Sequence, residues 1–404
     1  MKGWLYLLFF CCCAGAVFSQ NKLSGRVINA VTKEPVPFAN VFFANTTIGM
    51  STREDGTFSL SGFPNGKYDI TVTSVGFRQL QKPIDFTIPH KQVVEILINE
   101  DTRELEEVVV KEDNPNREND FRMFTNLFIG ETPHAEKCTI GNPGDIHLYF
   151  DPETREFTAH ARKPIEIINQ AMGLRIFYHL NSFDYNYKTG VFVITGIPQI
   201  QYLTPKSKAE ERKWIKERKD AYHGSVMHFM RALFRDSLAA AGFSVRKVYS
   251  VPNRERIPQA AIDAGIKKYR AVTSSHFSVN DSLSYFLKMK NKPEMRDSVA
   301  PEVLAAHDLV KDASVAYHGK LQIVYEKEKE DWAYVKTQRR SIRINQTSQI
   351  HLIGNQPLLI YSNGYYENPT DVFLEYYWSW DEKIASLLPL DYEPEKDIPH
   401  FNQP

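Results

Sequence analysis

The chain has 404 residues, a length that predicts two to three domains at about 150 residues per domain. Its 49 lysines and arginines balance 49 aspartates and glutamates. No global positive field is therefore available to attract phosphate backbones, and we expect no nucleic acid among the partners. Charged residues make up 24% of the chain and hydrophobic residues 42%, which is typical of globular proteins and excludes wholesale disorder.

Residues 1–19 have the pattern of a secretory signal peptide. Lys2 supplies a positive charge, and residues 4–18 form an apolar segment that is too short to cross a bilayer core of about 30 Å as a helix. Val17 and Ser19 occupy the −3 and −1 positions of a cleavage site before Gln20. We therefore expect an exported protein. No later run of eighteen apolar residues follows, so we expect no transmembrane segment after signal removal.

Three of the four cysteines, Cys11, Cys12 and Cys13, lie inside this signal segment. Phenylalanines precede them where a lipoprotein signal has small residues, so cleavage after Ser19 is the favoured interpretation. Only Cys138 remains in the mature chain. One thiol cannot form an internal disulfide, so we expect stability to come from buried apolar area.

Residues 20–100 alternate short β-prone segments with turn signals, at the spacing typical of a β-sandwich. Asp55-Gly56 predicts a hairpin, because a tight turn needs a positive φ that glycine adopts without steric cost. After a turn at residues 64–66, Tyr68, Ile70 and Val72 alternate with polar residues. We predict about seven strands in two packed sheets.

The order of motifs in this region resembles the carboxypeptidase-regulatory-like domain, a transthyretin-like (prealbumin-like) sandwich common in Gram-negative envelope proteins. The motifs are Ser24-Gly25-Arg26-Val27, Pro37-Phe38-Ala39-Asn40-Val41, Asp55-Gly56-Thr57-Phe58, Gly66-Lys67-Tyr68 and Ser74-Val75-Gly76-Phe77. The resemblance implies a non-catalytic spacer or interaction module, and the superfamily includes carbohydrate-binding sandwiches. It also implies a place in the periplasm or at the outer membrane.

Residues 101–120 are polar and turn-rich in their second half, which predicts a linker to an α+β region over residues 121–404. This region is expected to be one domain or two subdomains. In this domain we predict a hairpin over residues 145–160, a short helix over 164–172, and strands over 174–180 and 190–195. The fold class is therefore a multidomain chain, with an all-β sandwich followed by an α+β region.

A charged helix is predicted over residues 206–222, with Trp214, Arg218, Ala221 and Tyr222 on one docking face. A second helix is predicted from Ser225 to Ala241, followed by a strand after Gly242. Further helices are predicted over residues 257–269 and 300–310. Late strands are predicted over residues 321–326, 350–353 and 358–361.

Motifs for zinc, nucleotide or serine-hydrolase chemistry are absent from the sequence, so we expect no metal and no cofactor. Ser225 and His228 are weak catalytic candidates. An uncharacterised envelope hydrolase with its site in the C-terminal region therefore stays as the alternative to a non-catalytic protein.

Nine aromatic residues lie between Tyr361 and Tyr392. Tyr365, Tyr366, Trp378 and Trp380 are weak binding candidates, since such rings can line a sugar-stacking or protein-docking surface. An Asn363-Gly364 hairpin would expose both tyrosines. The alternative is that this segment closes the core, ending in a helix over residues 381–388. The predicted function is an envelope protein whose partner is a glycan or another envelope protein.

Overall fold

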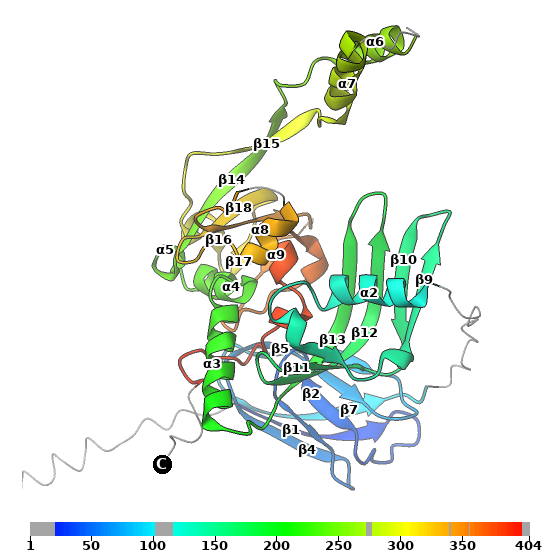
Figure 1. The fold of residues 1–404 in the computed structure, drawn as a ribbon. Coiled ribbons are helices and arrows are strands. Elements are labelled where there is room, and N and C mark those ends of the chain that lie inside the picture. The colour runs from blue at the N-terminus through cyan, green and yellow to red at the C-terminus, as the bar shows by residue number, and fades with distance from the viewer. Residues whose placement is uncertain (1–20, 102–115, 272–276, 339–340, 355, 398–404) are drawn as a thin grey trace, which may run out of the picture.

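A computed structural model describes residues 21–101, 116–271, 277–338, 341–354 and 356–397. The predicted signal peptide and most of the predicted linker lie outside the described residues. Figure 1 shows three sheet-containing parts: a sandwich at the bottom, a second sheet with one covering helix, and a third sheet that carries a projecting arm. None of the described helices is long and apolar enough to cross a membrane.

The N-terminal region is a two-sheet sandwich, as predicted. A three-stranded sheet has the order β4-β1-β7, and a four-stranded sheet has the order β3-β2-β5-β6. The strands are β1 (Asn21–Asn29), β2 (Asn40–Phe43), β3 (Gly49–Ser51), β4 (Thr57–Phe63), β5 (Gly66–Thr73), β6 (Leu80–Phe86) and β7 (Lys91–Ile98). Alternating residues of the two sheets meet in one apolar core, in which Phe43 stacks on Tyr68 at 4.8 Å and meets Phe63 edge-on at 5.0 Å.

The Asp55-Gly56 turn forms, but the predicted hairpin around it is wrong. Gly56 has a φ of +76° and its backbone N–H donates to the Arg53 carbonyl at 2.9 Å. The strands on either side, β3 and β4, belong to different sheets. A tight turn fixes only the local reversal of the chain, and in this sandwich the chain uses that reversal to cross from one layer to the other.

The second part is a six-stranded sheet in the order β8-β11-β12-β10-β9, with β13 also paired to β12. Helix α2 (Arg117–Phe128) lies across one face of this sheet (Figure 1) and buries Phe124 and Phe128 against it. The helix begins inside the predicted linker, which therefore ends before Arg117. The elements are η1 (Ala135–Lys137), β8 (Cys138–Ile140), η2 (Pro143–Asp145), β9 (Ile146–Asp151), β10 (Glu156–Ala161), β11 (Ile165–Asn169), β12 (Leu174–Asn186) and β13 (Phe192–Tyr202).

The predicted hairpin at residues 145–160 is confirmed by the pairing of β9 with β10. The predicted helix over residues 164–172 is wrong, because residues 165–169 form strand β11 between β8 and β12. Ile165 and Ile167 are fully buried in the core of this sheet. An apolar run of this length fits a helix or a buried strand by periodicity alone, and the pairing partners decide between them. The free thiol of Cys138 lies at the edge of this core, and burial raises its pKa to about 12.

The third part is a five-stranded sheet in the order β15-β14-β18-β19-β21, with a small β16-β17-β20 sheet beside it. Its strands are β14 (Phe243–Pro252), β15 (Met295–Val299), β16 (Val310–Lys311), β17 (Ser314–Val315), β18 (Gly319–Tyr325), β19 (Gln346–Leu352), β20 (Leu358–Leu359) and β21 (Val372–Tyr376). Its helices are α4 (Val226–Phe234), α5 (Leu238–Ala241), α8 (Trp332–Gln338) and α9 (Tyr377–Asp381), with short turns η3 (Ala306–Asp308) and η4 (Pro369–Asp371). Helix α3 (Lys208–Tyr222) and the short turn η5 (Ile384–Ser386) contribute side chains to the core of the six-stranded sheet.

Helix α3 agrees with its prediction, and its docking face is confirmed because Trp214, Arg218, Ala221 and Tyr222 are all buried. The single helix predicted from Ser225 to Ala241 is two helices, α4 and α5. The predicted helices over 300–310 and 381–388 are wrong, since both segments are irregular around one short turn. The second of these segments contributes core side chains to the six-stranded sheet, and that tertiary contact replaces regular helix formation.

Strands β14 and β15 extend away from the body and carry α6 (Gln259–Arg270) and α7 (Phe277–Asn291) at their end (Figure 1). Ile262, Ile266 and Met289 form a small core between the two helices. This arm is separate from the other three cores.

The sandwich is joined to the rest of the chain by backbone and side-chain contacts. The turn between β2 and β3 pairs with β13, since the Asn45 N–H donates to the Pro198 carbonyl at 2.6 Å and the Ile200 N–H donates to the Thr46 carbonyl at 3.1 Å. On the other side, Lys67 forms an ion pair with Glu367. The sandwich is therefore packed directly against the α+β region, rather than held at a distance from it.

Candidate functional site

The predicted catalytic pair, Ser225 and His228, lies at the start of α4. The Ser225 hydroxyl accepts the backbone N–H of His228 at 3.1 Å, so it serves as the N-cap of the helix. His228 Nδ1 accepts the backbone N–H of Gly224 at 3.2 Å. Burial, helped by the neighbouring His223, lowers the pKa of His228 to about 4. Among the hydrogen bonds of the described residues, none joins the Ser225 hydroxyl to an imidazole nitrogen.

The two predicted binding tyrosines lie on the turn at residues 363–364, which forms as predicted. The Gly364 N–H donates to the Tyr361 carbonyl at 2.9 Å. The hydroxyl of Tyr365 donates to the Asp69 carboxylate of strand β5 at 3.1 Å, and Tyr366 packs against the core of the third part. Both rings are therefore at internal contacts, and the expected exposure of the tyrosines at a hairpin end is wrong.

The two predicted binding tryptophans differ in their surroundings. Trp378 is 2% exposed and its Nε1 donates to the Gly224 carbonyl at 2.8 Å. Trp380 is half-buried and lines a cavity of about 350 Å³ between α2, α8 and α9. The structure thus brings none of the four aromatic candidates together on one open surface.

A cleft of about 560 Å³ lies where the sandwich meets the α+β region. Its walls are the turn at residues 62–65 of the sandwich, residues 211–218 of α3, and the C-terminal segment 391–397, with Tyr202 at the end of β13. We call it the interdomain cleft. Its volume lies in the range of small-ligand sites, and its position between two domains is the usual one.

Tyr202 provides an aromatic surface in this cleft. It is the last residue of β13, and its side chain is 48% exposed. The guanidinium carbon of Arg218 lies 5.1 Å from the ring centroid, within the distance of a cation–π contact. The ring is therefore supported from the protein side while nearly half of the residue stays accessible to a ligand.

Arg218 itself is held by three hydrogen bonds. Its Nε and Nη2 donate to the Asp397 carboxylate at 2.8 and 2.9 Å, and its Nη1 donates to the Met172 carbonyl at 2.7 Å. Such a bidentate pair fixes the plane of the guanidinium. Since each of its three nitrogens donates a hydrogen bond inside the protein, Arg218 acts as a rigid support for Tyr202.

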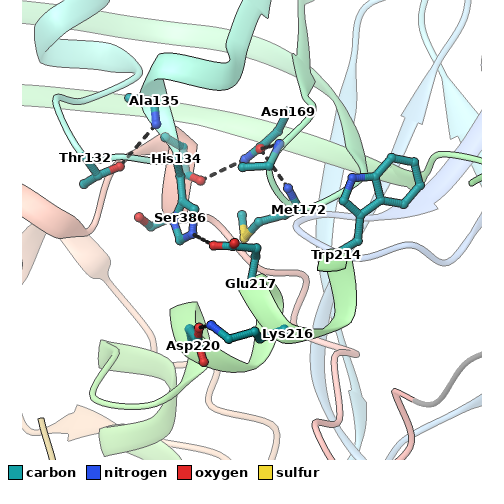
Figure 2. A network of polar contacts seen from close by, with 12 residues as sticks. Thr132, His134, Ala135, Asn169, Met172, Trp214, Lys216, Glu217, Asp220 and Ser386 are labelled. Carbon is teal, nitrogen blue, oxygen red and sulfur yellow. Dashed lines mark hydrogen bonds and ion pairs between the residues drawn. The ribbon is translucent and has the colours of Figure 1, made fainter. Parts of the chain in front are cut away.

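The network in Figure 2 fixes helix α3 on the six-stranded sheet behind the cleft. The Asn169 side chain accepts the backbone N–H groups of Ala171 and Met172 at 3.0 and 3.1 Å. The loop held in this way offers the Gln170 carbonyl to Trp214 Nε1 at 2.9 Å. These bonds position the carbonyl groups of Gln170 and Met172. The two carbonyls accept hydrogen bonds from Trp214 and Arg218 on the cleft-facing side of α3. A second tie is the ion pair of His134 with Glu217 at 3.1 Å (Figure 2).

The polar lining of the cleft is rich in acceptors. Its charged residues are Glu211, Arg218, Asp391, Glu393, Lys396 and Asp397. Asp391 accepts the backbone N–H of Thr47 at 2.9 Å, and burial raises the pKa of its carboxyl group. Carboxylates accept hydrogen bonds and do not donate them when ionised. Together with the exposed ring of Tyr202, this lining suits a ligand with many hydroxyl donors and an apolar face.

The sequence predicted one helix face that lines this cleft, but it did not predict the cleft as a site. The helical spacing of Trp214 and Arg218 predicted their shared face, but Tyr202 was missed because it follows a strand with no local motif. The acidic tail at residues 391–397 was the one available signal for the opposite wall. Among the described residues, no group of three or more histidine, cysteine, aspartate or glutamate side chains is arranged to hold a metal ion.

Comparison with known proteins identifies the first domain. Residues 23–110 match the model of the family described as the CarboxypepD_reg-like domain. The N-terminal sandwich is a CarboxypepD_reg-like domain. The match ends before α2, so the α+β region lies outside it. A search of curated proteins gave no match.

Solved structures give only distant likenesses to the chain. A DUF3823 family protein from Bacteroides ovatus is 11% identical, with 46% of this chain and 82% of that chain covered and a TM-score of 0.17. A putative membrane-associated protein of unknown function from Bacteroides fragilis is 8% identical, with 85% and 92% covered and a TM-score of 0.17. A streptococcal ancillary pilin is 7% identical, with 48% and 61% covered and a TM-score of 0.19. Scores this low carry no argument about fold or function.

Proposed function

We propose that this chain is an exported, non-catalytic protein of the Gram-negative cell envelope that binds a glycan in the interdomain cleft. The observation that carries the proposal is the half-exposed residue Tyr202, which contacts Arg218 and lies in a cleft lined by several carboxylates. A flat apolar face with hydrogen-bond acceptors around it matches the alternating C–H faces and hydroxyl groups of a sugar.

The position of the CarboxypepD_reg-like domain supports the proposal. The turn at residues 62–65 of the sandwich forms one wall of the cleft, and α3 forms the opposite wall. Because the sandwich pairs with β13 through backbone hydrogen bonds, the two walls are held at a fixed separation. The sandwich therefore acts as half of the binding site, in addition to any role as an interaction module.

A glycan array with the mature chain, followed by titration of the best glycan, tests this function. We expect Tyr202→Ala to weaken binding by about 1–2 kcal/mol, roughly 5- to 30-fold, because the stacking surface is lost. Tyr202→Phe keeps the ring and should bind nearly as well as the unaltered chain. Tyr249→Ala removes another exposed tyrosine, on strand β14 outside the cleft, and should have no effect. Equal binding by Tyr202→Ala and Tyr249→Ala would contradict the assignment of the cleft.

The envelope location is tested separately by expression of the full chain in a Gram-negative host. We expect the protein in the periplasmic or outer-membrane fraction, with an N-terminus at Gln20 in N-terminal sequencing. Retention of the intact chain in the cytosolic fraction would contradict the export assignment without affecting the in vitro binding test.

A further inference from the structure

A second cavity, outside the interdomain cleft, lies between the C-terminal end of α2, helix α8 and helix α9. It has a volume of about 350 Å³. Phe192 at the start of β13, Tyr334 on α8 and Trp380 on α9 form aromatic walls, while Lys383 and Glu131 supply its charged groups. We call it the Lys383 cavity. Its lining comes from elements far apart in the sequence, so only the tertiary structure assembles it.

The amine of Lys383 is enclosed by this cavity. Its Nζ lies 3.4 Å from the centroid of the Phe192 ring, which is cation–π distance. Within the described part of the chain, no carboxylate oxygen lies within ion-pair distance of this Nζ. Burial lowers the pKa of Lys383 to about 7, with Glu131 acting in the opposite direction. The amine is thus partly buried in the cavity, and it has no counter-ion among the described residues.

Trp380 adds a second donor. Its Nε1 is buried and makes no hydrogen bond in the described structure. Two other tryptophans, Trp214 and Trp378, donate the same group to backbone carbonyls at 2.9 and 2.8 Å. A buried donor left unsatisfied costs about 1–3 kcal/mol. Because this atom has almost no exposed area, a ligand acceptor reaches it only when the Trp380 ring, which lines the cavity, turns toward the ligand.

The backbone at this cavity is also unusual. Tyr376, which lines the cavity at the end of β21, has a φ of 62° and a ψ of −126°. A tyrosine in this region of φ and ψ is strained. Tyr376 is the N-cap of helix α9, and Trp380 lies on this helix. The strained backbone at Tyr376 therefore helps to position the indole of Trp380 at the cavity.

From these observations we infer that the Lys383 cavity binds a small ligand with a carboxylate group and a ring, such as a sugar acid. Lysine and tryptophan both offer donors and no acceptor, so the ligand must supply acceptor oxygens, and the two oxygens of a carboxylate can meet both. Among the described residues that line the cavity, one lysine beside one glutamate gives little excess positive charge for a dianion, which favours a carboxylate over a phosphate. The aromatic walls suit a ring attached to the carboxylate.

The charged and titratable groups around Lys383 set the expected pH dependence. They are Glu131 after α2, Tyr334 on α8 and Tyr376 at the end of β21. The pKa of Lys383, about 7, lies within the range from pH 6 to pH 8. Binding needs the protonated amine, so affinity should fall as the pH rises through about 7. By linkage we expect binding about tenfold weaker at pH 8 than at pH 6.

Calorimetric titration of the full mature chain with D-glucuronate, D-glucose and inorganic phosphate tests the inference. We expect saturable binding of glucuronate, at least tenfold tighter than that of glucose or phosphate. Lys383→Met should weaken it at least tenfold, and Trp380→Phe by about threefold to tenfold. Lys383→Arg keeps the charge, so it should retain binding but lose the pH dependence between 6 and 8.

Lys336→Met is the matched control, because Lys336 is an exposed lysine on α8 that does not line the cavity. It should bind glucuronate as the unaltered chain does. Thermal unfolding of each variant separates lost binding from lost folding. Absence of glucuronate binding, an equal affinity for glucose or phosphate, or an equal effect of Lys336→Met and Lys383→Met would overturn the inference. Tyr249→Ala alters an exposed tyrosine that lines neither cavity, so it should also leave glucuronate binding unchanged.

Discussion

At the scale of single residues, Ser225 shows how a pattern typical of catalysis can serve the backbone instead. The hydroxyl accepts the His228 N–H and closes the first turn of α4. The Val226 N–H at the same helix end donates to Glu382 at 2.6 Å, and burial raises the pKa of Glu382 to about 8. The N–H groups of Val226 and His228, which have no partner within the helix, are thus satisfied by a glutamate and a serine that lie far apart in the sequence.

We expect Ser225→Ala to destabilise the protein by about 1 kcal/mol, because a helix N-cap is lost. Urea unfolding followed by circular dichroism measures this change. Ser225→Thr keeps a capping hydroxyl and should be less affected. Ser207→Ala removes the N-cap of α3, whose hydroxyl accepts the Glu210 N–H at 3.2 Å, and is the control for a cap without a neighbouring imidazole. An unchanged stability of Ser225→Ala would contradict the capping role, and loss of a hydrolytic activity in this variant would favour the hydrolase alternative.

At the scale of elements, the sequence patterns predicted helices and strands correctly where the residues of the element itself determine its structure. The face of α3 follows from the spacing of Trp214, Arg218 and Tyr222, and a buried stripe of this kind is a property of the helix itself. The segment 164–172 failed because a short apolar run does not distinguish a helix from a strand with neighbours on both sides. The segment 381–388 failed because its side chains enter the core of a distant sheet.

The residues of the candidate sites show the same difference between what local patterns predict and what tertiary contacts decide. Tyr202 and Lys383 were both missed, since neither lies in a motif and each acquires its role from residues far away in the chain, such as Arg218 and Phe192. Trp380 was selected only for being aromatic. Its unsatisfied Nε1, the feature that matters for binding, depends on the packing of α9.

At the scale of the whole molecule, the contact between the sandwich and the α+β region decides the architecture. Asn363 is 4% exposed and its side-chain amide donates to the Lys67 carbonyl at 2.9 Å. The backbone of Gly66 lies so close to this side chain that a Cβ atom on Gly66 would be 2.4 Å from Asn363 Cγ. A glycine is therefore required at this position for close approach of the two domains.

We expect Gly66→Ala to destabilise the protein by roughly 1–3 kcal/mol through overpacking at the domain interface. Calorimetric unfolding should show a lower midpoint, or two transitions if the domains separate. Gly144→Ala is the control, because a Cβ atom at Gly144 meets no neighbouring atom. In the double variant with Asn363→Ala, the cost of Gly66→Ala should become smaller, since the clashing side chain is gone. Additive effects of the two substitutions would contradict the proposed contact.

The sequence by itself determined the class of the first domain, the helix α3 and its buried face, and the expected export. These depend on turn residues, on periodicity and on a short apolar leader, all of which act over a few neighbouring positions. Only the tertiary structure decided that the sandwich packs against the rest of the chain, and that Tyr202 and Lys383 lie in cavities. The reason is physical: a cavity is formed by side chains from distant segments, and the free energy that brings those segments together comes from long-range burial that no local pattern records.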